Sequence, residues 1–366
     1  MIRLAIPSID YQEERAVQLV LRSGFLVQGK TVAQFEEAVA SYLDVKYAVA
    51  VNSGTSALHL ALLALDIGHG DEVIVPDYTF PATANVVELA GAKPVFVDID
   101  PATFNINPKA VERCITKRTK AIIPVHLFGQ SADLAPIMRL AKKYKLKVVE
   151  DAACVLGAEY KGRKCGIIGD VGCFSFHPRK IITTGEGGMV VTDNSTVAGR
   201  LKILRNHGIA YKNNKIDFVA AGFNYRMTEI QAAIGLVQLK KIEALIGARR
   251  KVAGLYNAQL SSINWIKIPR VPADNTHVFQ TYIIQISGSL NSGQLIEYLR
   301  KNGVEANFGT YALHKLTYYK NKYHLRNSQF PVSENVFKTS IALPVFEHLS
   351  INQIRRIAAI LRKFQQ

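Results

Sequence analysis

Short runs of apolar residues recur along the first part of the chain and alternate with longer amphipathic stretches. Seven of the runs have the length and composition of buried strands, and they cover residues 47–51, 73–75, 94–97, 121–124, 148–150, 174–176 and 189–191. Helix-length segments lie between most of them, for example residues 56–65, 83–90 and 134–144. This alternation predicts an α/β fold with a mostly parallel seven-stranded sheet that helices cover on both faces.

The rest of the chain has a different pattern. An amphipathic opening runs to about Leu43, and a long helical pattern covers residues 228–253. A strand-like run at 280–286 and helical segments at 294–301 and 351–364 follow, which is typical of a small α+β domain. We therefore predict a large domain over residues 1–246 and a small C-terminal α+β domain over residues 247–366, with the boundary near Gly247.

Composition limits the possible classes of protein. A chain of 366 residues with 48% apolar residues can bury a large core. It has no apolar run of 18 residues, and its start lacks the basic end and long apolar stretch of a secretion signal, so we expect a soluble cytoplasmic protein without a membrane partner. Its four cysteines show neither C-x-x-C nor zinc-ligand spacing, which favours reduced thiols and no metal.

The charge balance is strongly positive, with a formal net charge of +16 at pH 7. Such a surplus attracts polyanions or speeds the capture of a phosphorylated substrate. The basic residues are scattered and form no DNA-reading motif, so solvated helix faces account for most of them and we expect no nucleic-acid partner.

Ligands of parallel sheets gather beyond the carboxyl ends of the strands, so residues that follow the predicted strands are candidates for chemistry. The first predicted strand leads into Asn52-Ser-Gly-Thr-Ser56 and then a helix. The amides of Gly54 and Thr55 and the Thr55 hydroxyl could converge there on an anion, as in a phosphate seat. An ordinary helix cap by Ser53 or Thr55 is the alternative.

Three further residues lie at or shortly after the ends of predicted strands. Asp151 directly follows the predicted strand 148–150 and would be costly to bury without a positive partner, although an aspartate there could also cap a helix. Phe80 could stack on a flat ring or fill the core. Ser175 precedes a turn and could donate its hydroxyl to a phosphate or simply be a solvated turn serine.

Lys180 completes the set. It lies between an aromatic strand and the glycine turn 185–188, where tight and partly desolvated surroundings favour a free amine that attacks an aldehyde. Most lysines are surface residues, but here the amine accompanies a phosphate seat and a carboxylate. Pyridoxal 5′-phosphate (PLP) needs those three groups, for its aldehyde, its phosphate and its ring nitrogen, so we predict that PLP is the cofactor.

Several segments resemble the DegT/DnrJ/EryC1/StrS family of PLP-dependent sugar aminotransferases, of the perosamine synthase-like kind, in the family's order and over essentially the whole chain. The segments are 53–62, 70–76, 150–153, 174–180 and 185–192. The resemblance implies an aspartate aminotransferase-like (type I PLP) fold and a homodimer with shared active sites.

The resemblance also implies roles for individual residues. Lys180 would be the Schiff-base lysine and the carrier of protons, Asp151 the partner of the ring nitrogen and Phe80 the stacking ring, while Gly54, Thr55 and Ser175 would contact the phosphate. The segment 222–233 resembles the stretch in which an asparagine, here Asn224, reaches the phosphate in the neighbouring subunit.

Substrate contacts are implied at Arg226, for which a structural role is equally open, and at His314. Two departures leave contacts unassigned: Cys154 stands where many relatives have Gln or His beside the cofactor hydroxyl, and Lys30 replaces a frequent proline.

We therefore predict an aminotransferase that moves an amino group from an amino acid, with L-glutamate as the expected donor, to a nucleotide-linked keto-deoxysugar. A PLP-dependent sugar dehydratase of the same family is one alternative, but it would have histidine in place of Lys180. The others are a nucleic-acid-binding regulator, suggested only by the basic composition, and a PLP binder without catalytic activity.

Overall fold

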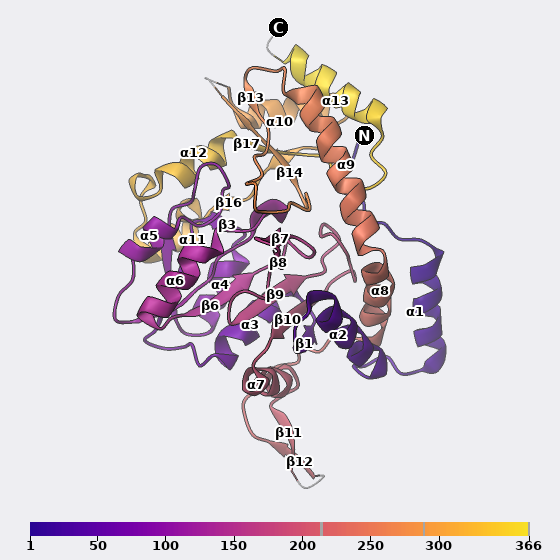
Figure 1. Cartoon of the computed structure of the whole chain (residues 1–366), viewed down its shortest axis with the longest axis vertical. Coiled ribbons are helices and arrows are strands. Elements are labelled where there is room, and N and C mark those ends of the chain that lie inside the picture. The colour runs from indigo at the N-terminus through magenta and orange to yellow at the C-terminus, as the bar shows by residue number, and fades with distance from the viewer. Residues whose placement is uncertain (213–214, 288–289, 365–366) are drawn as a thin grey trace.

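A seven-stranded sheet forms the centre of the larger part of the chain in the computed structural model, which describes residues 1–212, 215–287 and 290–364 (Figure 1). The strand order is β1-β10-β9-β6-β5-β2-β4. The two pairs that β10 makes are antiparallel and the other four are parallel, so six strands run in one direction. The strands are β1 (Tyr47–Val51), β2 (Glu72–Pro76), β4 (Lys93–Val97), β5 (Thr119–Ile122), β6 (Lys147–Asp151), β9 (Val171–Ser175) and β10 (Gly188–Thr192). The predicted mostly parallel sheet of seven strands is confirmed.

The observed strand bounds differ most from the predicted ones in β5 and β9. β5 ends at Ile122 and not at residue 124, because Pro124 has no N–H for the ladder and only its carbonyl is used, as acceptor for the Asp151 amide. β9 begins at Val171, earlier than predicted, because the pattern discounts Gly172. That glycine packs so closely on Gly166 that a Cβ atom would lie 1.9 Å from the Gly166 carbonyl oxygen.

Helices cover both faces of the sheet. Strand residues alternate between the faces, so that Val49 and Val51 pack with α3, α4 and α7, whereas Ala48 and Ala50 pack with α2 and α8. α5 and α6 cover the second face farther along, over Ile122. The helices are α1 (Tyr11–Ser23), α2 (Lys30–Leu43), α3 (Gly54–Ala64), α4 (Ala82–Leu89), α5 (Pro108–Arg113), α6 (Leu134–Tyr144), α7 (Ser195–Arg205) and α8 (Glu229–Lys240).

The helix predicted over residues 228–253 is two helices, α8 and α9 (Ile242–Leu260). They are separated at Lys241, whose amide donates to the Gln238 carbonyl in a tightened turn. The Lys241 ammonium lies 2.9 Å from Asp10 and 2.7 Å from Glu13, at the start of α1. Partners this distant in the sequence leave no trace in helical periodicity.

A second core forms around a four-stranded sheet in the C-terminal part of the chain, with strand order β13-β14-β17-β15. Its members are β13 (Ile266–Lys267), β14 (Tyr282–Ile286), β15 (Asn307–Phe308) and β17 (Ser340–Leu343), packed by α9, α10 (Ser292–Lys301) and α13 (Ile351–Lys363). Ile2 also belongs to this core. A boundary at residue 247 falls inside α9, and the division into two domains remains a prediction.

Short elements connect these layers. They are β3 (Tyr78–Thr79), η1 (Leu127–Gly129), β7 (Glu159–Tyr160), β8 (Arg163–Lys164), β11 (Ile209–Lys212), β12 (Lys215–Phe218), β16 (Tyr311–Ala312), η2 (Leu313–Lys315), α11 (Thr317–Tyr323), η3 (Asn327–Gln329) and α12 (Pro331–Thr339). Strand β16 pairs with β3, so a segment from late in the chain lies beside the end of β2. Among the helices of the described residues, none has the length and apolar composition needed to cross a bilayer.

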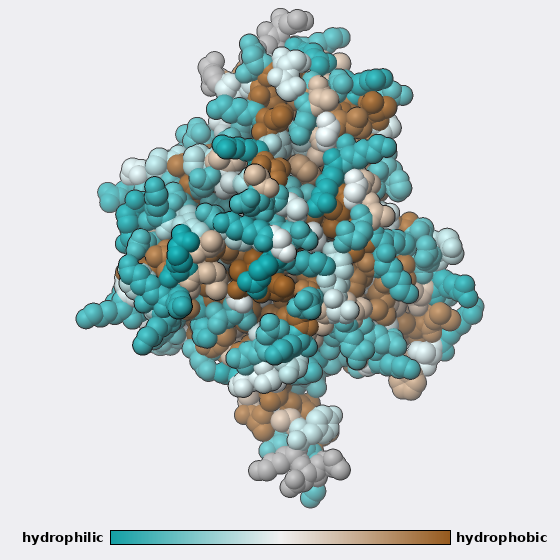
Figure 2. Space-filling view, in the orientation of Figure 1, coloured by the Kyte–Doolittle hydropathy of each residue, from teal (hydrophilic) through white to brown (hydrophobic). Residues whose placement is uncertain are grey.

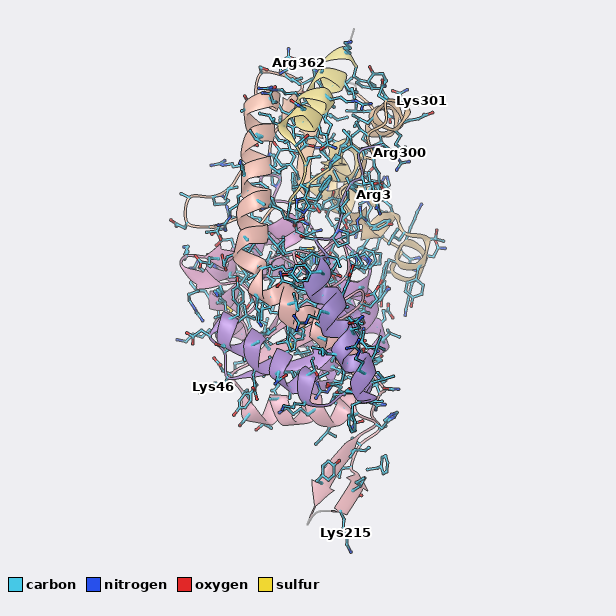
Figure 3. All side chains as sticks on the ribbon, turned by 90° about the vertical axis from the view of Figure 1, so that its right-hand side faces the viewer. Arg3, Lys46, Lys215, Arg300, Lys301 and Arg362 are labelled. Atoms are coloured by element: carbon cyan, nitrogen blue, oxygen red, sulfur yellow. The ribbon has the colours of Figure 1, made fainter. Side chains whose placement is uncertain are left out.

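Most of the excess of basic over acidic residues lies in the C-terminal part of the chain. Residues 248–366 contain 16 Lys and Arg but only 5 Asp and Glu, which gives 11 of the 16 surplus charges. Figure 3 labels Arg3, Arg300, Lys301 and Arg362 along this part, at the opposite end of the molecule from the β11–β12 hairpin. The hairpin projects from the body below α7 (Figure 1).

Candidate active site

The carboxyl ends of β1, β6 and β9 lie at the same edge of the sheet, and the predicted site residues follow these strands. Asp151 is the last residue of β6, Ser175 is the last residue of β9, and α3 begins three residues after β1. Doubly covered parallel sheets bind their ligands at this edge.

The N-terminus of α3 is arranged to hold an anion. Ser53 caps the helix, because its Oγ accepts the Ser56 amide at 3.0 Å and its carbonyl accepts the Ala57 amide at 3.0 Å. The first amides of a helix have no intrahelical acceptor, so those of Gly54 and Thr55 are left for a ligand. Ser175 is directly adjacent, since a Cβ atom on Gly54 would lie 2.7 Å from its Cβ. The N-terminus of α3 can therefore be capped by Ser53 and still offer amides to an anion.

The anion seat is formed by the first residues of α3 and by Ser175, and a glycine lies between these two parts. Gly188, the first residue of β10, pairs with Val51 on one side and with Ser175 on the other. A Cβ atom at this position would lie 2.3 Å from the Ser53 carbonyl oxygen, a contact that only a backbone shift could relieve.

We expect Gly188→Ala to lower the free energy of unfolding by about 1–3 kcal/mol through overpacking, measured by urea denaturation. The matched control is Gly199→Ala in α7, where a Cβ atom would meet nothing within 4 Å. That change should stabilise the helix by roughly 0.5–1 kcal/mol. Equal stability of the Gly188 variant and the unsubstituted chain would contradict the close approach.

Asp151 is buried, with 5% of its surface exposed. Its Oδ2 accepts the Thr83 hydroxyl at 2.8 Å, and its Oδ1 accepts the Ala153 amide at 3.3 Å. Burial raises the pKa of Asp151 above its ordinary value, while the Thr83 hydrogen bond and the charge of Lys180 act in the opposite direction. A cationic ligand would favour the ionised carboxylate further.

The neighbouring Glu150 has a different role. It is fully buried and accepts a hydrogen bond from the His126 ring at 2.9 Å and from the amides of Gly166, Ile168 and Gly169. Successive strand residues point to opposite faces, so these bonds fix the end of β6 and thereby the position of Asp151.

Lys180 is half-buried in a turn after β9, where its amide donates to the His177 carbonyl at 2.8 Å. Its Nζ lies 3.2 Å from the Cys154 sulfur. The side chain of Gln280 donates to the Arg179 carbonyl at 2.8 Å and so ties the turn to the C-terminal part. Cys154, which the sequence left unassigned, is thus a neighbour of the lysine amine.

Phe80 is 61% exposed, which argues against the alternative that it fills the core. It follows β3, and its ring meets that of Tyr311 edge-on at a centroid distance of 6.1 Å. Pairing of β3 with β16 places Tyr311 there. An exposed ring at this edge is available to a flat ligand.

His314 is completely buried, and its role as a substrate contact remains a prediction. Its Nδ1 lies 2.6 Å from Asp77 and its Nε2 lies 3.2 Å from Glu334, which leaves no ring nitrogen for a ligand. Burial alone would lower the pKa of His314, but the two carboxylates outweigh it and raise the pKa. The resemblance of its loop could not reveal these distant acceptors.

Arg226 donates to the Asn206 side chain at 2.7 Å, which favours its structural role. Asn224 has an exposed side chain, and its carbonyl accepts from the Asn52 side chain at 3.4 Å. The Asn52 amide also donates to the Tyr225 carbonyl at 2.9 Å. The segment of Asn224 therefore supports the phosphate seat of its own chain while its side chain points outward.

Lys30 is exposed at the first position of α2. Proline is often found at the first position of a helix. The helix start is held from a distance by Glu229, whose carboxylate accepts the amides of Gly29, Thr31 and Val32 at 2.8–2.9 Å. Lysine is tolerated there because this carboxylate supplies the cap.

One edge of the sheet carries a lysine amine, a buried carboxylate, an exposed aromatic ring and a helix-terminal anion seat. These are groups expected in an aminotransferase. Comparison with known proteins agrees. The DegT/DnrJ/EryC1/StrS aminotransferase family matches residues 7–362, and the chain belongs to this family.

Individual relatives match over nearly their full length. GDP-perosamine synthase from Caulobacter vibrioides is 41% identical over 364 residues, covering 98% of this chain and 97% of that protein. Among solved structures, Helicobacter pylori PseC, an aminotransferase involved in the biosynthesis of pseudoaminic acid, has a TM-score of 0.94 and 32% identity and covers 99% of this chain and 98% of its own. Streptococcus pneumoniae Spr1654, solved in its PMP form, has a TM-score of 0.93 and 30% identity, with coverage of 98% and 99%. The predicted fold class and the predicted sugar aminotransferase of this family are confirmed.

Proposed function

We propose that the protein uses PLP to transfer an amino group from L-glutamate to the keto carbon of a nucleotide-linked keto-deoxysugar. The observation that carries the proposal is the position of the Lys180 amine, 3.2 Å from the sulfur of Cys154, which comes three residues after the buried Asp151. The seat formed by Gly54, Thr55 and Ser175 lies at the same edge of the sheet. The name of the Caulobacter vibrioides relative supports a nucleotide-linked sugar, and the PMP form of the pneumococcal relative supports the cofactor.

The residues at this edge fit PLP. Gly54, Thr55 and Ser175 would bind its phosphate, Asp151 would pair with its ring nitrogen, and Phe80 would lie against its ring. Bound there, PLP supplies an electron sink for the substrate carbon that carries the amine. Lys180 would hold the aldehyde through Nζ and, once released, carry protons at Nζ during the transfer.

The proposal includes a homodimer in which Asn224 of one subunit completes the phosphate seat of the other. The exposed side chain of Asn224 supports it. So do large exposed apolar residues on and after α1 and on the hairpin, which a second copy would cover: Tyr11, Leu19, Phe25, Val27, Tyr211, Ile216 and Phe218. Figure 2 shows apolar surface on the α1 side and beside the hairpin. We also propose a cytoplasmic location.

The test of the function is the visible spectrum of the purified protein with PLP, before and after L-glutamate, followed by a screen of nucleotide-linked keto-sugars. We expect PLP absorbance that L-glutamate removes and a matching keto-sugar restores. Absorbance that no amino acid changes would indicate a PLP binder without transfer activity. A protein that binds no PLP but binds DNA with a steep salt dependence would indicate the regulator instead.

The shared site predicts complementation between two defective variants, measured at a PLP concentration that fills the unsubstituted protein but not Asn224→Ala. We expect Asn224→Ala to weaken PLP binding by about 10–100-fold, through loss of a hydrogen bond to a charged group. Lys180→Ala should be inactive in its own site. When the two variants are mixed by unfolding and refolding, each mixed dimer has one site with both residues intact, and turnover should reappear. Mixtures with no more turnover than the separate variants would place Asn224 outside the partner's site.

A further inference from the structure

Two buried threonine hydroxyls form a chain behind Asp151. Thr83, in the first turn of α4, has 1% of its surface exposed and donates to Asp151 Oδ2 at 2.8 Å. Thr79, in β3, is equally buried, and its Oγ1 lies 3.1 Å from the Thr83 Oγ1.

The direction of these hydrogen bonds depends on the charge of Asp151. A hydroxyl has one proton to donate, and an ionised carboxylate can only accept. With Asp151 ionised, Thr83 gives its proton to Oδ2, and Thr79 can then give its own proton to the Thr83 oxygen. Both buried hydroxyls are satisfied in this arrangement, which is therefore matched to the charged form of the acid.

The two threonine hydroxyls also determine which oxygen of the Asp151 carboxylate is available to a ligand. Oδ2 accepts the Thr83 hydroxyl at 2.8 Å, whereas Oδ1 accepts, within the described residues, the longer hydrogen bond from the Ala153 amide at 3.3 Å. Oδ1 would thus be the oxygen available to pair with the ring nitrogen if PLP binds.

We infer that Thr83, supported by Thr79, is a positioning residue that keeps Asp151 ionised and turned toward the PLP ring nitrogen. This inference rests on the proposed function.

Other groups around Asp151 act on its charge as well. Lys180 after β9 and His126 after β5 favour the ionised form, and the Cys173 thiol faces it from β9. Burial raises the pKa of Asp151 and Thr83 opposes that rise, so loss of the hydroxyl raises the pKa further. The acid would then be protonated as the pH falls through a higher value, and a neutral acid no longer pairs with a cationic ring. Weaker cofactor binding should therefore begin at a higher pH.

The experiment is a PLP titration of the full-length protein between pH 5 and 9, followed by absorbance, for Thr83→Val, Thr83→Ser and Thr79→Val. Valine keeps the shape of threonine without the hydroxyl, and serine keeps the hydroxyl. Thermal unfolding of each variant before PLP is added establishes that it is folded.

We expect Thr83→Val to weaken PLP binding by about 10–100-fold near neutral pH and to move the acidic limb of the binding curve up by about one pH unit. Thr83→Ser should restore both values, and Thr79→Val should move the limb in the same direction by less. Unchanged binding and an unchanged limb in Thr83→Val would overturn the inference. So would equal weakening in Thr83→Val and Thr83→Ser, which would indicate packing. Failure of the unsubstituted protein to bind PLP would instead refute the proposed function.

Discussion

Substitution of Lys180 by alanine is expected to cut turnover by at least about 10²–10⁴-fold, the usual cost of a lost general base. The loss should include the visible absorbance of PLP bound through the lysine. The physical reason is that this amine is proposed both to hold the aldehyde and to carry protons. Steady-state kinetics with L-glutamate and a keto-sugar, together with the spectrum, measure the two effects.

The control for this variant is Lys202→Ala, which removes an exposed lysine of α7, a helix that contributes none of the proposed PLP contacts. Its turnover and spectrum should match those of the unsubstituted protein. A small soluble amine should also restore part of the activity of Lys180→Ala, since it replaces the missing base. Full turnover by Lys180→Ala without such an amine would refute the assigned role.

Asp151→Asn is expected to lower the rate of the L-glutamate half-reaction by about 10–10³-fold. A nearby opposite charge shifts a pKa by about 1–3 units, so its loss reduces protonation of the ring nitrogen by that factor. Asparagine keeps the size of the side chain and removes only the charge. Stopped-flow absorbance after mixing with L-glutamate gives the rate.

The matched control is Asp170→Asn, just before β9 at the other edge of the sheet, where Asp170 pairs with Lys147 at 3.0 Å. This partly exposed pair contributes at most about 1 kcal/mol to stability, and the half-reaction should be unaffected. If Asp151→Asn transfers the amino group at the normal rate, the buried acid has no part in the chemistry.

Much of the fold could be predicted because strands buried on both faces are apolar along their whole length. All five residues of β2 are buried, for example, and their run stands out from the amphipathic helices around it. Breaks within a long helical pattern were harder to predict. Lys241 divides a helix through contacts with Asp10 and Glu13, more than 220 residues earlier.

The candidate site followed from one rule, that ligands lie beyond the carboxyl ends of strands. This rule selects Gly54, Asp151 and Ser175, and the structure brings them to one edge. It cannot select Thr83, because a threonine near a helix start is ordinarily a cap and its carboxylate partner comes 68 residues later. The surroundings of His314 could not be predicted for a related reason, since only the folded chain shows the two carboxylates beside its ring.

The pairing of β3 with β16 affects the order in which the enzyme is completed during synthesis. Domains emerge from the ribosome beginning with their N-terminal parts. A nascent chain that ends before residue 311 already contains Lys180, Asp151 and both threonines but lacks the strand that pairs with Thr79. The candidate site is therefore complete only when about the last sixth of the polypeptide arrives, and a ribosome stalled earlier carries a chain without this strand pair.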